Sequence, residues 1–289
     1  MESLVSSISL TDSIVINDKN EEKALKKLKK LIEEYVIEKR LKTDTCQELI
    51  CHLETIKVDN TLLLDYLRCR KNSVNDAWQT IKTYVESKFI HYSNVFRNEN
   101  DEISEKARGL LRNHICGMLK NLDKHGRRII YIDTSKWDIN EFSMDHLAAA
   151  IIVGCESYWR EPEVQKNGIV ALTNSDGFSG AHARQFSFYK MMRMRNILKC
   201  FPISVKRCFY LKTHITMRIS ANLFKSLLPG KLASRIYIYS PNEKATQLNE
   251  IASPEILPDW MGGTLSVEEA SVDVSYWETG INAMKIGYR

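Results

Sequence analysis

The chain has 289 residues, of which 44% are hydrophobic and 27% charged, as in ordinary globular proteins with a substantial core. Seven irregularly spaced cysteines in a chain of this length favour free thiols in a reducing compartment. The N-terminus lacks the basic and apolar segments of a secretory signal, and the longest apolar run, residues 147–155, is far shorter than the ~20 residues that span a bilayer. We therefore expect a soluble cytoplasmic protein rather than a secreted or membrane-spanning one.

The first hundred residues are predicted to be helical. Between Glu21 and Arg40, apolar residues recur at helical spacing, with acidic residues at the start of the segment and basic residues at its end. Further helices are predicted over residues 44–56 and 60–70, and another begins after the capping residue Ser73.

Beyond residue 127, short apolar strands alternate with longer helices. The predicted strands are rich in β-branched and aromatic residues and comprise residues 128–133, 169–173, 208–211 and 235–239. The predicted helices comprise residues 144–160, which follow the capping residue Ser143, and residues 182–200 and 215–228. Because this alternation requires crossover connections, we expect an α/β fold with a mostly parallel sheet.

Enzymatic motifs are incomplete in this sequence. The segment GFSGA, residues 177–181, approximates the nucleophile elbow G-x-S-x-G. No acidic residue lies between Ser179 and Glu243, and the last histidine is His214, so the hydrolase order of serine, acid and histidine is not completed. Phosphate-binding glycine motifs are absent, and the cysteines and histidine at positions 46, 51 and 52 match no zinc spacing. We expect no enzymatic activity, no cofactor and no metal.

Basic residues are distributed unevenly along the chain. Residues 177–242 contain twelve Lys and Arg and no Asp or Glu, whereas the remainder carries 29 basic and 36 acidic residues. Such a stretch indicates a polyanionic partner, either phospholipid head groups or nucleic acid. No nucleic-acid-binding motif occurs in it, and its many methionines and aromatic residues suit the wall of an apolar pocket. We favour a lipid carrier that docks on anionic membranes, and nucleic-acid binding is the alternative.

Five segments in order resemble the CRAL-TRIO lipid-binding family, in the branch of the α-tocopherol transfer protein and cellular retinaldehyde-binding protein. The segments are LLLDYLRCRKNSVNDAW at 62–78, KWD at 136–138, QKNGIVALTNSDGFSGAH at 165–182, FP at 201–202 and ILPDWMGG at 256–263. The first departs from the family pattern at Asp65, where an arginine is usual. The resemblance covers roughly residues 25–270.

This resemblance implies a helical N-terminal module, followed by a domain whose sheet floors a hydrophobic cavity that a gate helix closes. We assign residues 1–20 to a flexible tail, 21–100 to the helical module, 101–265 to the lipid-binding domain and 266–289 to a C-terminal segment. The implied function is that of a monomeric intracellular carrier that holds one small lipid, such as a tocopherol, retinoid or carotenoid, and acts peripherally on membranes. The alternative within the same fold is a scaffold that senses lipid without transferring it.

The resemblance also implies three sets of site residues. The cavity candidates are Ile151, Cys155, Ile169, Thr173, Phe186, Met194, Ile197 and Phe201, with ordinary core packing as the alternative for all eight. Cys155 and Thr173 are the polar candidates that orient a hydroxyl or carbonyl of the ligand.

The gate is expected at about residues 212–235, with Met217 turned outward to the membrane. Its lipid-covering candidates are Ile219, Leu223, Phe224, Leu227 and Leu228. The candidates for binding phosphoinositides or another anionic surface are Arg70, Lys206, Arg207, Lys231 and Arg235. Ser204 stands where the tocopherol carrier has a lysine, and Arg207 is the candidate replacement.

Overall fold

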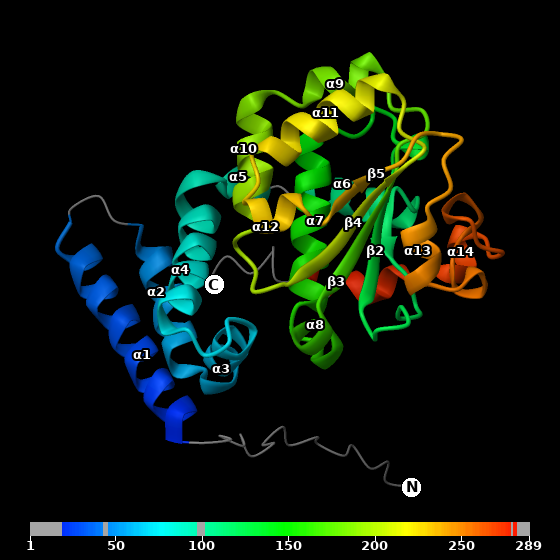
Figure 1. Ribbon diagram of the computed structural model, residues 1–289. Helices are drawn as coiled ribbons and strands as arrows, with labels where there is room; N and C mark the ends of the chain where they lie inside the picture. Colours follow the sequence, from blue (N-terminus) through cyan, green and yellow to red (C-terminus); the bar gives the residue numbers. More distant parts are fainter. Residues whose placement is uncertain (1–18, 43–45, 97–101, 279, 282–289) are drawn as a thin grey trace, which may run out of the picture.

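The computed structural model describes residues 19–42, 46–96, 102–278 and 280–281. A helical N-terminal part packs beside an α/β domain (Figure 1). Most of the predicted tail, residues 1–20, and residues 282–289 of the predicted C-terminal segment lie outside the described residues. The predicted domain boundaries stay predictions.

Four amphipathic helices make up most of the N-terminal part. They are α1 (Lys19–Arg40), α2 (Gln47–Val58), α3 (Asn60–Cys69) and α4 (Val74–Glu86). The first buries a stripe that includes Leu25, Leu28 and Ile32, at the spacing expected of one helical face. The predicted cap of α4 is confirmed, because the backbone N–H of Asp76 donates to Ser73 Oγ at 3.4 Å. A π-helical turn at Ser87–His91 then leads to α5 (Ser93–Phe96) and α6 (Glu102–Arg112).

The α/β domain contains one five-stranded sheet in the order β1-β2-β3-β4-β5. The strands are β1 (Cys116–Met118), β2 (Arg128–Asp133), β3 (Ile169–Asn174), β4 (Val205–Leu211) and β5 (Ile236–Ile238). The first pair is antiparallel and the other three pairs are parallel. The mostly parallel sheet is therefore confirmed. Strand β1 was not predicted, because its three residues are too few to show a periodicity.

Helices of varied length surround the sheet. They are α7 (Met144–Tyr158), α8 (Pro162–Asn167), α9 (Gly180–Gln185), α10 (Phe188–Ile197), α11 (Ile215–Ser226), α12 (Gly230–Ala233), α13 (Thr246–Ile251) and α14 (Val267–Ala270). The single helix predicted over residues 182–200 was wrong, because α9 ends at Gln185 and Ser187 caps the start of a second helix, α10. Ser187 Oγ accepts from the backbone N–H of Lys190 at 3.3 Å.

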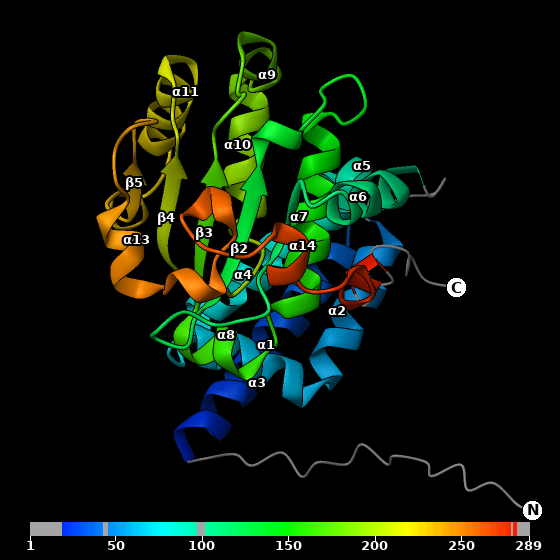
Figure 2. The ribbon, with the colours of Figure 1, turned by 90° about the vertical axis from the view of Figure 1, so that its right-hand side faces the viewer.

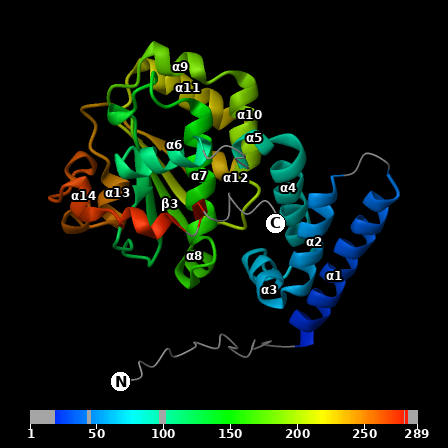
Figure 3. The same ribbon diagram turned by 180° about the vertical axis from the view of Figure 1, so that it is seen from behind.

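The two faces of the sheet have different neighbours. Ile129, Val170 and Phe209 turn to one face, where the chain from Tyr239 to Ala270, including α13 and α14, covers them (Figure 2). Residues of the same strands one position along turn to the opposite face, toward α7, α10 and α11. Seen from behind, α6 packs against α7 on this second side (Figure 3).

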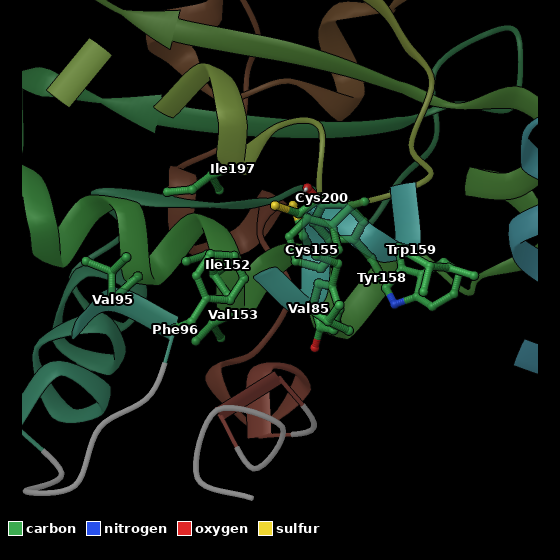
Figure 4. Packing of buried hydrophobic residues seen from close by; sticks show 14 of the residues in the cluster. Val85, Val95, Phe96, Ile152, Val153, Cys155, Tyr158, Trp159, Ile197 and Cys200 are labelled. Carbon is green, nitrogen blue, oxygen red and sulfur yellow. Dashed lines mark hydrogen bonds between the residues drawn. The ribbon is translucent and has the colours of Figure 1, made fainter. Parts of the chain in front are cut away.

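A continuous apolar core joins the helical part to α7. Val85, Val95 and Phe96 lie beside Ile152 and Val153 of α7, and all five are buried (Figure 4). This contact fixes the position of α7, the helix that faces the sheet across the cavity described below.

Gly263 provides a test of the packing in the segment that covers the far face of the sheet. A Cβ at this position would lie 1.8 Å from the carbonyl oxygen of Leu257, so backbone would have to move. We expect Gly263→Ala to lower the free energy of unfolding by about 2 kcal/mol or more, as measured by urea denaturation. Gly230→Ala is the control, because no atom lies within 4 Å of its added Cβ. Equal effects of the two changes would contradict the close approach.

Candidate functional site

Two adjoining chambers lie between the sheet and the helices α7, α10 and α11. The upper chamber, of about 100 Å³, lies near the carboxyl ends of β2–β4 and is lined by residues that include Trp137, Phe178 and Met217. The lower chamber, of about 200 Å³, lies near the start of the strands and is lined by residues that include Ala171 and Cys208. Together they form the cavity that the resemblance implied.

The wall of this cavity is apolar and uncharged. Among the described residues that line either chamber, none is Asp, Glu, Lys, Arg or His. Three cysteines, Cys116, Cys155 and Cys208, line the lower chamber, and burial raises the pKa of each thiol to about 12. These thiols are therefore neutral, and a charged ligand group in the cavity would find no counter-charge.

A ring of six residues belongs to the walls of both chambers. Three come from adjacent strands of the sheet and three from the helices opposite. They are Ile132, Thr173 and Tyr210 on β2, β3 and β4, and Ile151, Met194 and Phe224 on α7, α10 and α11. We call this ring the waist of the cavity.

The structure brings seven of the eight predicted cavity residues to the wall. Ile151, Thr173 and Met194 lie in the waist, Phe186 lines the upper chamber, and Cys155, Ile169 and Phe201 line the lower chamber. Ile197 does not belong to them. It is fully buried in the core at the end of α10 (Figure 4). That the seven contact a ligand stays a prediction.

Helix α11 covers the cavity with Phe224 on its inner side as predicted, but Met217, Ile219 and Leu223 face the opposite way from the prediction. Met217 is buried and lines the upper chamber, whereas Ile219 and Leu223 are 62% and 47% exposed. The inner face consists of Met217, Ala221 and Phe224. Because Ala221 is small and weakly hydrophobic, the apolar repeat of this face is hard to recognise in the sequence. Of the remaining gate candidates, Leu228 lines the lower chamber and Leu227 is half-buried outside the wall.

A basic cluster lies beside the start of β4. Partial burial, and then the positive charges of Arg235, Arg127, Lys71 and Lys231, lower the pKa of Lys206. Lys231 is exposed on α12, next to Leu232 in the wall of the lower chamber. Sequence reasoning missed Lys71 and Arg127, because they come from a turn after α3 and a loop before β2.

Two of the predicted basic candidates are placed elsewhere. Arg70 is half-buried and donates to Thr80 Oγ1 at 2.9 Å and to the carbonyl oxygen of Phe201 at 3.2 Å, so it ties the helical part to the domain. Arg207 turns to the opposite face of the sheet from the cavity, where its guanidinium lies over the ring of Tyr237. Arg207 therefore does not replace the lysine missing at Ser204.

The basic stretch also does not form one continuous face. Arg193 is buried and pairs with Asp145, which Lys190 approaches at 3.4 Å. Acidic residues from outside the stretch thus neutralise part of its charge.

The serine of the elbow-like segment has a structural role in α9. Ser179 Oγ lies 2.8 Å from Nδ1 of His182, and the backbone N–H of Ser179 donates to the same nitrogen at 3.1 Å. Nε2 of this buried histidine lies 2.9 Å from the carbonyl oxygen of Trp137, to which it donates. The histidine therefore fastens the start of α9 to the loop after β2.

Within the part of the chain that the structure describes, no helix combines the length and the apolar character that crossing a membrane requires. Among the same residues, no three His, Cys, Asp or Glu side chains gather as a metal-binding group.

Comparisons with known proteins agree with this geometry. Residues 112–263 match the model of the CRAL/TRIO domain. Clavesin-1 of Rattus norvegicus is 26% identical over 212 residues, or 73% of this chain and 58% of that protein. Clavesin-2 of Homo sapiens is 23% identical over 219 residues, or 73% of this chain and 63% of that protein. The chain thus spans less than two thirds of the length of these relatives.

The fold is also found in a solved structure. The crystal structure of Sfh5 aligns with a TM-score of 0.51 and 10% sequence identity over 93% of this chain and 97% of that one. Because the CRAL/TRIO model matches more than half of the chain, this protein belongs to the CRAL/TRIO domain family of lipid-binding and lipid-transfer proteins.

Proposed function

We propose that this protein carries one small hydrophobic lipid in the two-chamber cavity and exchanges it with anionic membranes. The observation that carries this proposal is the construction of α11. Its inner face lines an apolar cavity, while Ile215, Ile219 and Leu223 are exposed on its outer side. A lid with apolar residues on both sides suits a helix that covers lipid in one state and contacts membrane in another.

The proposed cycle needs no covalent chemistry. The basic cluster brings the carrier to anionic head groups, including phosphoinositides. The outer side of α11 then enters the interface, the helix swings away from the sheet, and one lipid enters or leaves. Burial of ~400 Å² of apolar ligand surface at ~25 cal/mol per Å² provides roughly 10 kcal/mol before entropic costs, which is ample for specific binding.

The first test is mass spectrometry of an organic extract of the protein purified from a eukaryotic host. We expect one dominant lipid at close to one per chain. Ala171→Phe, which fills the lower chamber from β3, should remove that lipid while the protein stays folded. An empty wild-type extract, even after incubation with tocopherols, retinoids, carotenoids and phospholipids, would contradict the carrier function and make nucleic acid the next partner to test.

The outer side of α11 can be tested separately from the cavity. We expect Ile219→Glu combined with Leu223→Glu to reduce transfer to vesicles at least tenfold, since each apolar side chain contributes about 1.5–3 kcal/mol when buried. The bound lipid should be retained. Val58→Glu is the control, because Val58 is 72% exposed on α2, away from the lid. Equal loss of lipid and transfer would contradict the division between the two sides of the helix, and a wild type that holds lipid without exchange would favour the sensing scaffold.

The basic cluster predicts a dependence on the charge of the membrane. We expect Lys231→Glu to weaken binding to vesicles that contain anionic lipid about thirtyfold, because each basic residue near such a surface contributes about 1 kcal/mol and the change reverses its sign. Binding to neutral vesicles should not change. Lys244→Glu alters the net charge equally at an exposed position outside the cluster. If both variants bind alike in co-sedimentation, net charge rather than this cluster controls docking.

A further inference from the structure

Two hydroxyl groups in the waist of the cavity lack hydrogen-bond partners. Among the described residues, neither the side chain of Thr173 nor that of Tyr210 makes a hydrogen bond. Both residues line both chambers. Burial raises the pKa of the Tyr210 hydroxyl, which keeps it protonated and able to donate.

The other hydroxyls of the wall differ in this respect. Thr134 Oγ1 donates to the carbonyl oxygen of Asn174 at 2.7 Å, and Ser220 Oγ donates to that of Thr216 at 3.0 Å. Tyr131 is paired with Ser271, and the hydroxyl of Tyr158 lies 3.5 Å from Cys155 Sγ. Thr173 and Tyr210 are half-buried, and neither hydroxyl is among the fully buried unpaired atoms of the described residues, so both remain open to a partner that enters the cavity.

The two residues are neighbours. Thr173 and Tyr210 are register partners on the adjacent parallel strands β3 and β4, so they lie side by side on the same face of the sheet. Apolar wall extends from them in both directions, into the upper chamber and into the lower chamber. A polar ligand atom at this point would therefore have hydrocarbon on both sides of it.

We propose that Thr173 and Tyr210 donate hydrogen bonds to an uncharged oxygen in the interior of the lipid, the carbonyl of a ketone or an ester, with an apolar group in each chamber. The inference rests on the proposed function and names the class of lipid carried. A carbonyl oxygen has two lone pairs and can accept from two donors whose side chains leave the same face of the sheet. The uncharged wall disfavours carboxylates and phosphates at this position.

A fluorescent ketone tests this pair directly. The probe 6-propionyl-2-(dimethylamino)naphthalene has its carbonyl between an aromatic ring and a short alkyl chain, and its emission moves to longer wavelength when that carbonyl accepts hydrogen bonds. The matched probe is 6-propyl-2-(dimethylamino)naphthalene, which lacks the carbonyl. Each is titrated into the wild type, into Thr173→Val and Tyr210→Phe, and into the control Ser220→Ala, which removes a hydroxyl that already has a partner in the protein.

We expect Thr173→Val and Tyr210→Phe each to weaken binding of the ketone about five- to tenfold, and to move its bound emission to shorter wavelength. Affinity for the carbonyl-free probe should not change, which shows that the cavity is intact, and Ser220→Ala should affect neither probe. If both probes bind the wild type and the two variants bind the ketone unchanged, or lose both probes equally, the assigned role is wrong while the cavity remains a binding site. If neither probe binds the wild type, the proposed function and the inference that rests on it both fall.

Discussion

Successive side chains of a strand turn to opposite faces of the sheet, and this alternation decides what each side of the domain does. On β3, Val170 and Leu172 pack under the segment that includes α13 and α14, whereas Ile169, Ala171 and Thr173 form cavity floor. The face that Val170 and Leu172 share is covered by this packed segment of the chain. The other is roofed by helices that the core of the N-terminal part holds in place, so space for a ligand remains between roof and floor.

The helices that cover the cavity, which we call its roof, are not equally anchored in the hydrophobic core. Helix α7 packs against α5 and α6 and carries residues of the main core, such as Ile152 and Val153. Helix α11 has two buried residues, Met217 and Ala221, which lie outside that core, and its half-buried Phe224 packs against the core from the edge. An element with few buried contacts opens at a lower free-energy cost than one anchored in the core. The difference favours α11, rather than α7, as the proposed lid.

Many helices and strands could be predicted from the sequence, because they depend on the types and spacing of neighbouring residues. The caps at Ser73 and Ser143, and the strands β2 and β3, follow from side-chain type and spacing alone. The start of β4 could not be predicted. Its basic residues, Lys206 and Arg207, and a register shift beside Ile169 interrupt the alternation of apolar and polar side chains that marks a strand.

The residues of the candidate site could be predicted only in part. On α11 the sets 215/219/223 and 217/221/224 are both apolar at helical spacing, so periodicity predicts a helix without saying which side faces inward. Likewise Ile151 and Ile197 look alike in the sequence, but one lines the cavity and the other packs in the core. A cavity is an absence of packing, which depends on the distance between elements and not on any one residue.

Phe224 belongs both to α11, the proposed lid, and to the waist. In the proposed cycle, the outward movement of α11 withdraws one of the six waist residues as it uncovers the upper chamber. We therefore expect the two chambers to empty together rather than one after the other. Departure of the lipid should be a single kinetic event with one rate constant, set by the lid, and no half-released intermediate should accumulate.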